Sequence, residues 1–83
     1  MDRQQLVEAL LAAGQPPGSF QVTGVHSHEP VPTDFWFLRP GSGDGWEVGY
    51  FERGVYEVRK RFDAETEAAA WMYRAVTGRE PLP

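Results

Sequence analysis

The sequence contains no cysteine, no long apolar run and no excess of positive charge. Without cysteine, neither a disulfide framework nor a thiolate zinc site is available, which suits a reducing compartment. Because an apolar run of about 20 residues is missing, no membrane-spanning helix is expected. The first residues, Met1 to Gln5, lack the charged and then apolar layout of a signal peptide, so we expect a cytoplasmic protein.

The balance of charge limits the kind of partner. Twelve acidic and eight basic residues give a net charge of −4 at pH 7. Nucleic acid and anionic membranes repel a negative protein, so we expect neither of them as a partner. A basic protein is the better match, because opposite charges steer association.

The length of the chain predicts one domain over residues 1–83, with an ordered core over about 2–78 and a tail over 79–83. A chain of this size buries only about 60 to 65% of the surface that its unfolded form exposes, so its core must be efficient. Aromatic residues make up 13% of the sequence and supply large buried areas.

Residues 46–62 are expected to form a β-hairpin, and the length of its loop decides which side chains share a face. A two-residue loop of Arg53 and Gly54 would pair Tyr50 with Glu57 and would hold Arg53 at a positive φ, which is disfavoured. Both faces of the hairpin would then mix apolar and charged side chains.

A three-residue loop, residues 52–54, places Gly54 in the left-handed position at no steric cost, and we prefer it. This loop separates an apolar face from a charged outer face. The predicted core-facing residues are Trp46, Val48, Tyr50, Tyr56, Val58 and Phe62. The outer face then pairs Glu47 with Arg59 and Phe51 with Val55, and also carries Glu57.

The remaining periodicity predicts two helices and two further strands. Asp2 caps a first helix that ends at Gly14, and Asp63 caps a last helix that ends at Gly78. Residues 20–25 alternate as a weak strand, and residues 34–39 form a second strand whose apolar residues are consecutive. We therefore predict an α+β fold, a four-stranded antiparallel meander with the N-terminal and C-terminal helices packed on one face in the order αββββα, a two-layer sandwich.

The residues with possible chemistry do not assemble into a site at the sequence level. His26, His28 and Glu29 resemble metal ligands, but a site needs three or four rigid ligands and no second cluster is present. Ser27 next to His28 lacks an orienting acid and an oxyanion site. We therefore expect no catalytic residue, no bound metal and no cofactor, and no enzyme activity.

The one basic cluster, residues 59–61, lies beside aromatic residues and so raises the question of RNA stacking. Strand alternation sends Lys60 to the face opposite Arg59 and Arg61, and Glu47 and Glu57 partly neutralise that pair. This pattern favours a solvated strand face, so no nucleic-acid partner is expected.

The preferred register exposes Phe51 on the outer face, and an exposed phenylalanine ringed by acidic residues is typical of a protein interface. The consecutive residues 35–38 leave open whether Phe35 and Phe37 or Trp36 and Leu38 face outward with it. A third layer or a homodimer covering the same patch is the alternative explanation. The candidate partner-binding residues are Asp34, Phe35, Phe37, Asp44, Glu47, Phe51, Glu52, Arg53 and Glu57.

Three motifs in sequence order resemble the pattern of a known family. They are Phe20-x-Val22-x-Gly24, then Trp46-Glu47-Val48-x-Tyr50-Phe51-Glu52-Arg53-Gly54, then Arg61-Phe62-Asp63-x-Glu65-x-Glu67-Ala68. This order resembles that of small immunity proteins found beside bacterial polymorphic and contact-dependent toxins. The sequence departs from that pattern at Gly49, where a bulky residue is commoner, and in having no cysteine in its final helix.

The resemblance implies a non-enzymatic cytoplasmic protein that binds a cognate toxin domain and blocks its active site or substrate access. Toxins of such systems include nucleases and NAD-degrading enzymes, and a basic nuclease would complement the net negative charge. The alternative function is a general protein-interaction module or a small homodimer without a toxin partner.

Overall fold

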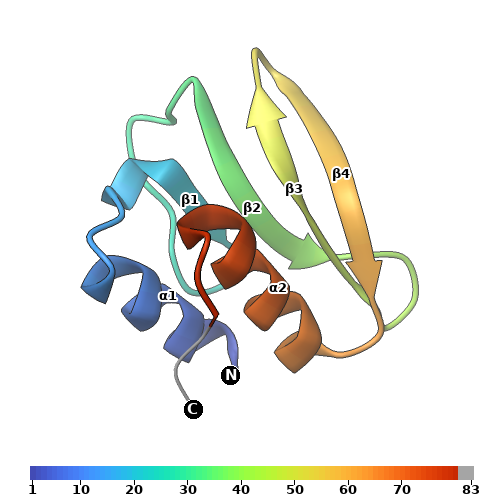
Figure 1. Ribbon diagram of the computed structural model, residues 1–83. Coiled ribbons are helices and arrows are strands. Elements are labelled where there is room, and N and C mark those ends of the chain that lie inside the picture. Colours follow the sequence, from blue (N-terminus) through green and yellow to red (C-terminus); the bar gives the residue numbers. More distant parts are fainter. Residues whose placement is uncertain (81–83) are drawn as a thin grey trace.

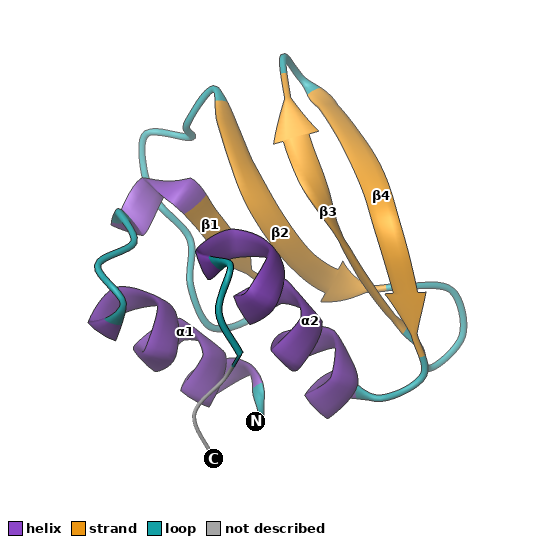
Figure 2. Ribbon diagram, viewed as in Figure 1, coloured by secondary structure: helices purple, strands orange, loops and turns teal. Residues whose placement is uncertain are grey.

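The computed structural model describes residues 1–80, so residues 81–83 of the predicted tail lie outside the described residues. The predicted α+β class with a helix at each end of four strands is confirmed. Figure 2 shows the elements by type. In chain order they are α1 (Arg3–Ala12), the short 3₁₀ helix η1 (Pro17–Ser19), β1 (Phe20–Val22), β2 (Asp34–Pro40), β3 (Trp46–Glu52), β4 (Val55–Phe62) and α2 (Glu65–Thr77).

The four strands form one sheet in the order β1-β2-β3-β4, and both helices lie on the same face of it (Figure 1). β1 runs parallel to β2, so the prediction of a purely antiparallel meander is wrong. The cause is a tight turn after β1, in which His26 pairs back against Val22 in an antiparallel bridge. The chain then returns past β1 and enters β2 from the same end.

The ends of the helices follow from their local sequence. At α1, the Asp2 carboxylate accepts a hydrogen bond from the Gln5 N–H (2.8 Å), and the Gln5 side chain accepts one from the Asp2 N–H (2.9 Å), which confirms Asp2 as the cap. At α2 the capping position is Ala64, which offers no side-chain acceptor, so the prediction of Asp63 is wrong by one residue. Gly78, at φ 74°, ends α2 as predicted.

The hairpin closes through the two-residue loop, so the predicted three-residue loop is wrong. Arg53 has φ 52° and Gly54 has φ 82°, the two positive values that a tight hairpin turn needs. As a result Tyr50 pairs with Glu57. The twist of this turn matches the twist of the strands, which offsets the cost of a left-handed arginine.

A β-bulge further along the hairpin shifts the register of β4 against β3 by one residue. Gly49 pairs with Val58, whereas Val48 pairs with Lys60, so Arg59 is an extra residue on β4. On the side of the bulge away from the turn, Trp46 pairs with Phe62 and both side chains reach the helices, as predicted. Between the bulge and the turn, Tyr56 and Val58 of β4 lie on the face opposite the predicted one.

The core lies between the helices and the sheet. Its buried residues are Leu6, Val7, Leu10, Phe20, Val22, Leu38, Val48, Ala68, Ala69, Met72 and Tyr73. The Trp36 ring packs edge-on against both Tyr50 (5.3 Å between centroids) and Trp71 of α2 (6.5 Å), so Tyr50 lies on the helix side.

Arg3 joins several elements at the start of α1. Its Nε lies 3.3 Å from the Glu65 carboxylate of α2, and its Nη1 donates to the Thr23 carbonyl after β1 (2.8 Å). Its guanidinium also lies 5.0 Å from the centre of the Trp46 ring. These contacts join α1 to α2 and to the sheet, and within residues 1–80 no helix covers the other face of the sheet.

Candidate protein-binding surface

The face of the sheet opposite the helices, called the outer face below, carries an aromatic layer formed by Phe35, Phe37, Phe51 and Tyr56. Phe35 stacks on Phe51 with 4.7 Å between ring centroids, and Tyr56 lies 4.6 Å from Phe51. Tyr56 also meets Phe37 edge-on at 5.2 Å. Three strands therefore contribute rings to one continuous apolar surface.

The depth of each ring decides which ones a partner can reach. Phe35 and Phe37 are each only 2% exposed, because the rings of the β3–β4 hairpin cover them. Phe51 is half-buried and Tyr56 is 47% exposed. The pair that faces outward is thus Phe35 and Phe37, but Phe51 and Tyr56 form the accessible surface.

Gly49 is part of the reason that the aromatic layer is compact. A Cβ atom at this position would lie 2.7 Å from Cζ of Phe37 and would collide with the backbone carbonyl of Glu57. Glycine therefore lets the Phe37 ring lie directly on β3.

An ion-paired cluster lies at the end of the aromatic layer. Glu47 is 8% exposed, and its two carboxylate oxygens accept hydrogen bonds from Nε of Arg39 (3.0 Å) and Nε of Arg61 (3.1 Å). The hydrogen bond from Arg39, opposed by burial and assisted by Arg61, holds the pKa of Glu47 below its usual value. Glu47 stays ionised and the cluster carries a net positive charge.

Arg39 also belongs to the aromatic layer. Its Cζ atom lies 4.8 Å from the centre of the Phe37 ring and 5.0 Å from that of Tyr56. Cation–π contacts of this kind hold a guanidinium flat against the rings. The position of Arg39 is therefore fixed by Glu47 on one side and by two rings on the other.

The predicted acidic rim around Phe51 is wrong for Glu52 and Glu57, whereas Glu47 lies on the outer face as predicted. Glu57 pairs directly with Tyr50, and paired residues of an antiparallel ladder point to the same face, so Glu57 lies on the helix side. Glu52 pairs with Asp34, and the Tyr50 hydroxyl donates to the Asp34 carboxylate at 3.0 Å. Burial, and then this hydrogen bond, raise the pKa of Tyr50.

The predicted contact residues are therefore divided between surfaces. The outer face holds Phe35, Phe37, Glu47 and Phe51, and the helix side of the hairpin end holds Asp34, Glu52 and Glu57. Asp44 lies exposed in the β2–β3 connection, and Arg53 lies exposed in the hairpin turn.

The outer face also contains residues that were missing from the predicted set, namely Tyr56, Arg39 and Arg61. Arg39 and Arg61 are the cross-strand neighbours of Glu47 on its two sides. The bulge in β4 brings Arg61 to that carboxylate, whereas the predicted register paired Glu47 with Arg59. Arg39 reaches the carboxylate through the β2–β3 ladder, independently of the bulge.

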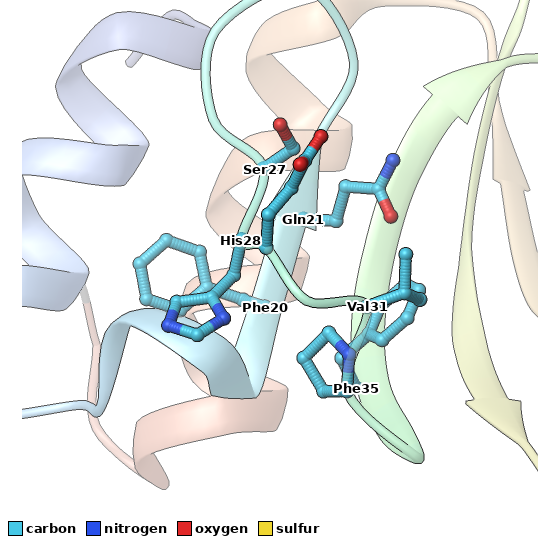
Figure 3. Close-up of a pocket in the computed structure, with 8 residues that line it drawn as sticks. Phe20, Gln21, Ser27, His28, Val31 and Phe35 are labelled. Carbon is cyan, nitrogen blue, oxygen red and sulfur yellow. The ribbon is translucent and has the colours of Figure 1, made fainter.

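The stretch containing the histidines frames a small cavity against β1 and the start of β2 (Figure 3). The cavity has a volume of about 80 Å³, below the size of small-molecule sites, and its lining is Phe20, Gln21, Ser27, His28, Glu29, Val31, Pro32 and Phe35. His26 stacks on Phe20 at 4.6 Å, and its Nε2 lies 2.8 Å from the Pro17 carbonyl. Nδ1 of His28 lies 3.4 Å from the Pro30 carbonyl. The two rings thus contact different backbone groups.

Within residues 1–80, no group of three or more side chains has an arrangement suited to a metal ion. In the same range, neither helix is both long and apolar enough to cross a membrane. Comparisons of the chain with protein-family models, with curated proteins and with solved structures find no match. The geometry of the outer face therefore supplies the basis for a functional proposal.

Proposed function

We propose that this protein is an immunity protein, which binds a cognate bacterial toxin domain through its outer face and blocks the toxin's active site or substrate access. The protein acts by occupying a surface and performs no reaction of its own. The observation that carries this proposal is the aromatic layer on a sheet face that neither helix covers.

The shape of this surface suits protein recognition. Phe51 and Tyr56 offer an apolar centre, and the ion-paired cluster of Arg39, Glu47 and Arg61 lies beside it as a polar border. Aromatic and arginine residues are enriched among the side chains that dominate binding free energy at protein interfaces. The resemblance of the sequence motifs to immunity proteins supplies the class of partner.

Co-purification with a neighbouring gene product tests the proposal. We expect a large secreted protein to be encoded immediately upstream and to end in a short variable domain. That domain, produced together with the present chain, is expected to elute as a stable complex and to lose its toxic activity. A domain that remains active and free in the presence of the chain would overturn the proposal.

Matched variants locate the binding surface. Phe51→Ala removes the half-buried ring of the outer face, and we expect it to weaken the complex at least tenfold, as for a central interface residue. Leu11→Ala removes a 43% exposed apolar side chain on α1 and is expected to leave the affinity unchanged. Circular dichroism of both variants separates lost contacts from lost folding.

A further inference from the structure

We propose that Arg39 and Arg61, held by the shared Glu47 carboxylate, form a binding site for a carboxylate side chain of the partner protein. This inference rests on the proposed function and deepens it, because it states the chemistry of the surface that docks on the outer face. The net charge of the protein favoured a partner with a basic surface, whereas this site favours an acidic residue of the partner at the point of contact.

The hydrogen bonds within the cluster leave donors free. Each arginine uses its Nε–H for Glu47, and within residues 1–80 the Nη nitrogens of Arg39 and Arg61 have no hydrogen-bond partner. The side chain of Arg39 is 37% exposed and that of Arg61 is 71% exposed, so these donors are accessible to water or to a partner. Guanidinium groups bind carboxylates through paired N–H donors.

The cluster is pre-organised for an incoming anion. Glu47 is only 10% exposed at its side chain and fixes both guanidinium groups, and the Phe37 and Tyr56 rings hold Arg39 from below. Side chains that are already ordered lose less conformational entropy on binding. One carboxylate between two guanidinium groups leaves one positive charge uncompensated, which a carboxylate of the partner would neutralise.

The aromatic rings beside the arginines indicate which side chain of the partner would lie next to its carboxylate. Tyr56 contacts both Arg39 (5.0 Å) and Phe51 (4.6 Å), so an apolar surface begins directly beside the charged groups. The matching partner segment carries an acidic residue next to an aromatic or aliphatic one. Such a pairing of an apolar anchor with a charge-assisted hydrogen bond provides both affinity and orientation.

Two other occupants fit less well. A second copy of the chain packed face to face would bring arginines against arginines, because Glu47 is already engaged and Glu57 lies on the opposite face. Nucleic acid offers phosphates, but the protein as a whole has a net charge of −4 and repels a polyanion.

A peptide titration followed by NMR tests the inference. The probe is a blocked peptide of sequence Ser-Asp-Phe-Asp-Ser, and the matched peptide has asparagine at both aspartate positions. We expect saturable shifts of the Nε–H signals of Arg39 and Arg61 and of the ring signals of Phe51 and Tyr56. The asparagine peptide is expected to bind at least tenfold more weakly.

The variants Arg61→Gln and Arg59→Gln form a matched pair. Both remove one positive charge from an exposed arginine of β4, but Arg59 pairs with Glu57 and not with Glu47. Arg61→Gln is expected to weaken binding of the aspartate peptide about tenfold, whereas Arg59→Gln is expected to leave it unchanged. Amide spectra of both variants confirm that the fold is retained.

Several results would overturn the inference. Absence of shifts with the aspartate peptide, or equal binding of the asparagine peptide, would show that no carboxylate is recognised. Equal or tighter binding of a short oligouridylate at the same residues would indicate a nucleic-acid surface. Sedimentation showing a dimer, with Tyr56 ring signals that shift as the protein concentration rises, would indicate self-association through this face. A stable complex with the cognate domain would remain compatible with either of the first two results. These results would therefore overturn the carboxylate site without overturning the proposed function.

Discussion

Glu47 joins two strands to β3 through one carboxylate. Arg39 from β2 and Arg61 from β4 each donate to a different oxygen, and the resulting pKa of Glu47 lies below the ordinary glutamate value of 4.5. A depressed pKa in the folded state means that the unfolded state binds more protons near that value. The stabilisation is therefore fully present above about pH 4.5 and is lost as the pH falls through the folded pKa.

Replacement of this carboxylate gives the first prediction. Glu47→Gln is expected to lower the free energy of unfolding by about 1 to 2 kcal/mol at neutral pH, because charge-assisted hydrogen bonds to partly exposed arginines are lost. Urea unfolding from about pH 7 to about pH 3 should show the difference from wild type shrinking as the pH falls. The control is Glu8→Gln, an exposed acid on α1, for which we expect little change at any pH. A pH-independent loss for Glu47→Gln would contradict the account.

Gly49 provides a steric prediction at the same scale. Gly49→Ala is expected to lower the free energy of unfolding by about 1 to 3 kcal/mol, because the new Cβ meets Phe37 and the backbone of β4. Gly18→Ala is the matched control, since its Cβ would have ordinary contacts at 3.5 Å or more. Thermal unfolding of the two variants compares them directly, and equal melting temperatures would exclude the close packing of Phe37 on β3.

The sequence located the residues of the outer face only in part. Phe51 was placed there correctly because strand alternation fixes its face relative to Tyr50. Arg61 was missed because its meeting with Glu47 depends on an extra residue in β4, and a bulge leaves no periodic trace in the sequence. Arg39 was missed because its contact with Glu47 depends on the β2–β3 register, which the sequence analysis did not predict.

At the scale of elements, the ends of strands and helices were more predictable than their pairing. Asp2 and Gly78 have side-chain or backbone properties that suit one position, so α1 and α2 were delimited closely. The register of the hairpin depended instead on a small difference between two turns. The preference of glycine for a positive φ favoured the three-residue loop, in which only Gly54 has a positive φ. In the structure Arg53 has a positive φ as well, so the loop has two residues.

The turn gives a prediction with opposite signs at adjacent residues. Arg53→Asn is expected to raise the free energy of unfolding by about 0.5 to 1 kcal/mol, because asparagine adopts a positive φ at lower cost and suits this turn. Gly54→Ala is expected to lower it by about 1 kcal/mol, because alanine gains a Cβ at φ 82°. Urea unfolding measures both variants. A loss of stability in Arg53→Asn would contradict the two-residue loop.

At the scale of the whole molecule, composition and element order were sufficient for the α+β class and for the two helices. The direction of β1 was not, because a strand of three residues carries no sign of whether its neighbour runs parallel or antiparallel. That direction is set by the tight turn at residues 23–26, where Val22 and His26 form an antiparallel bridge. No pattern in the sequence indicated this bridge.

The net charge of the protein and the local charge of its outer face have opposite signs. The value of −4 describes the field at a distance and predicts attraction of a basic domain. At contact, the outer face presents Arg39 and Arg61, whereas Asp34, Glu52 and Glu57 gather on the helix side. Under the proposed function, long-range steering and contact at the outer face would therefore involve charges of opposite sign on one small protein.

The proposed function requires that the outer face, and not the helices, binds the partner. The most direct measurement is NMR shift mapping of the isotope-labelled chain with and without its cognate domain. We predict that signals of Phe51, Tyr56, Arg39 and Arg61 change on complex formation and that those of the exposed side of α1, including Leu11, do not. Changes confined to α1 and α2, with the outer face unaffected, would contradict the account.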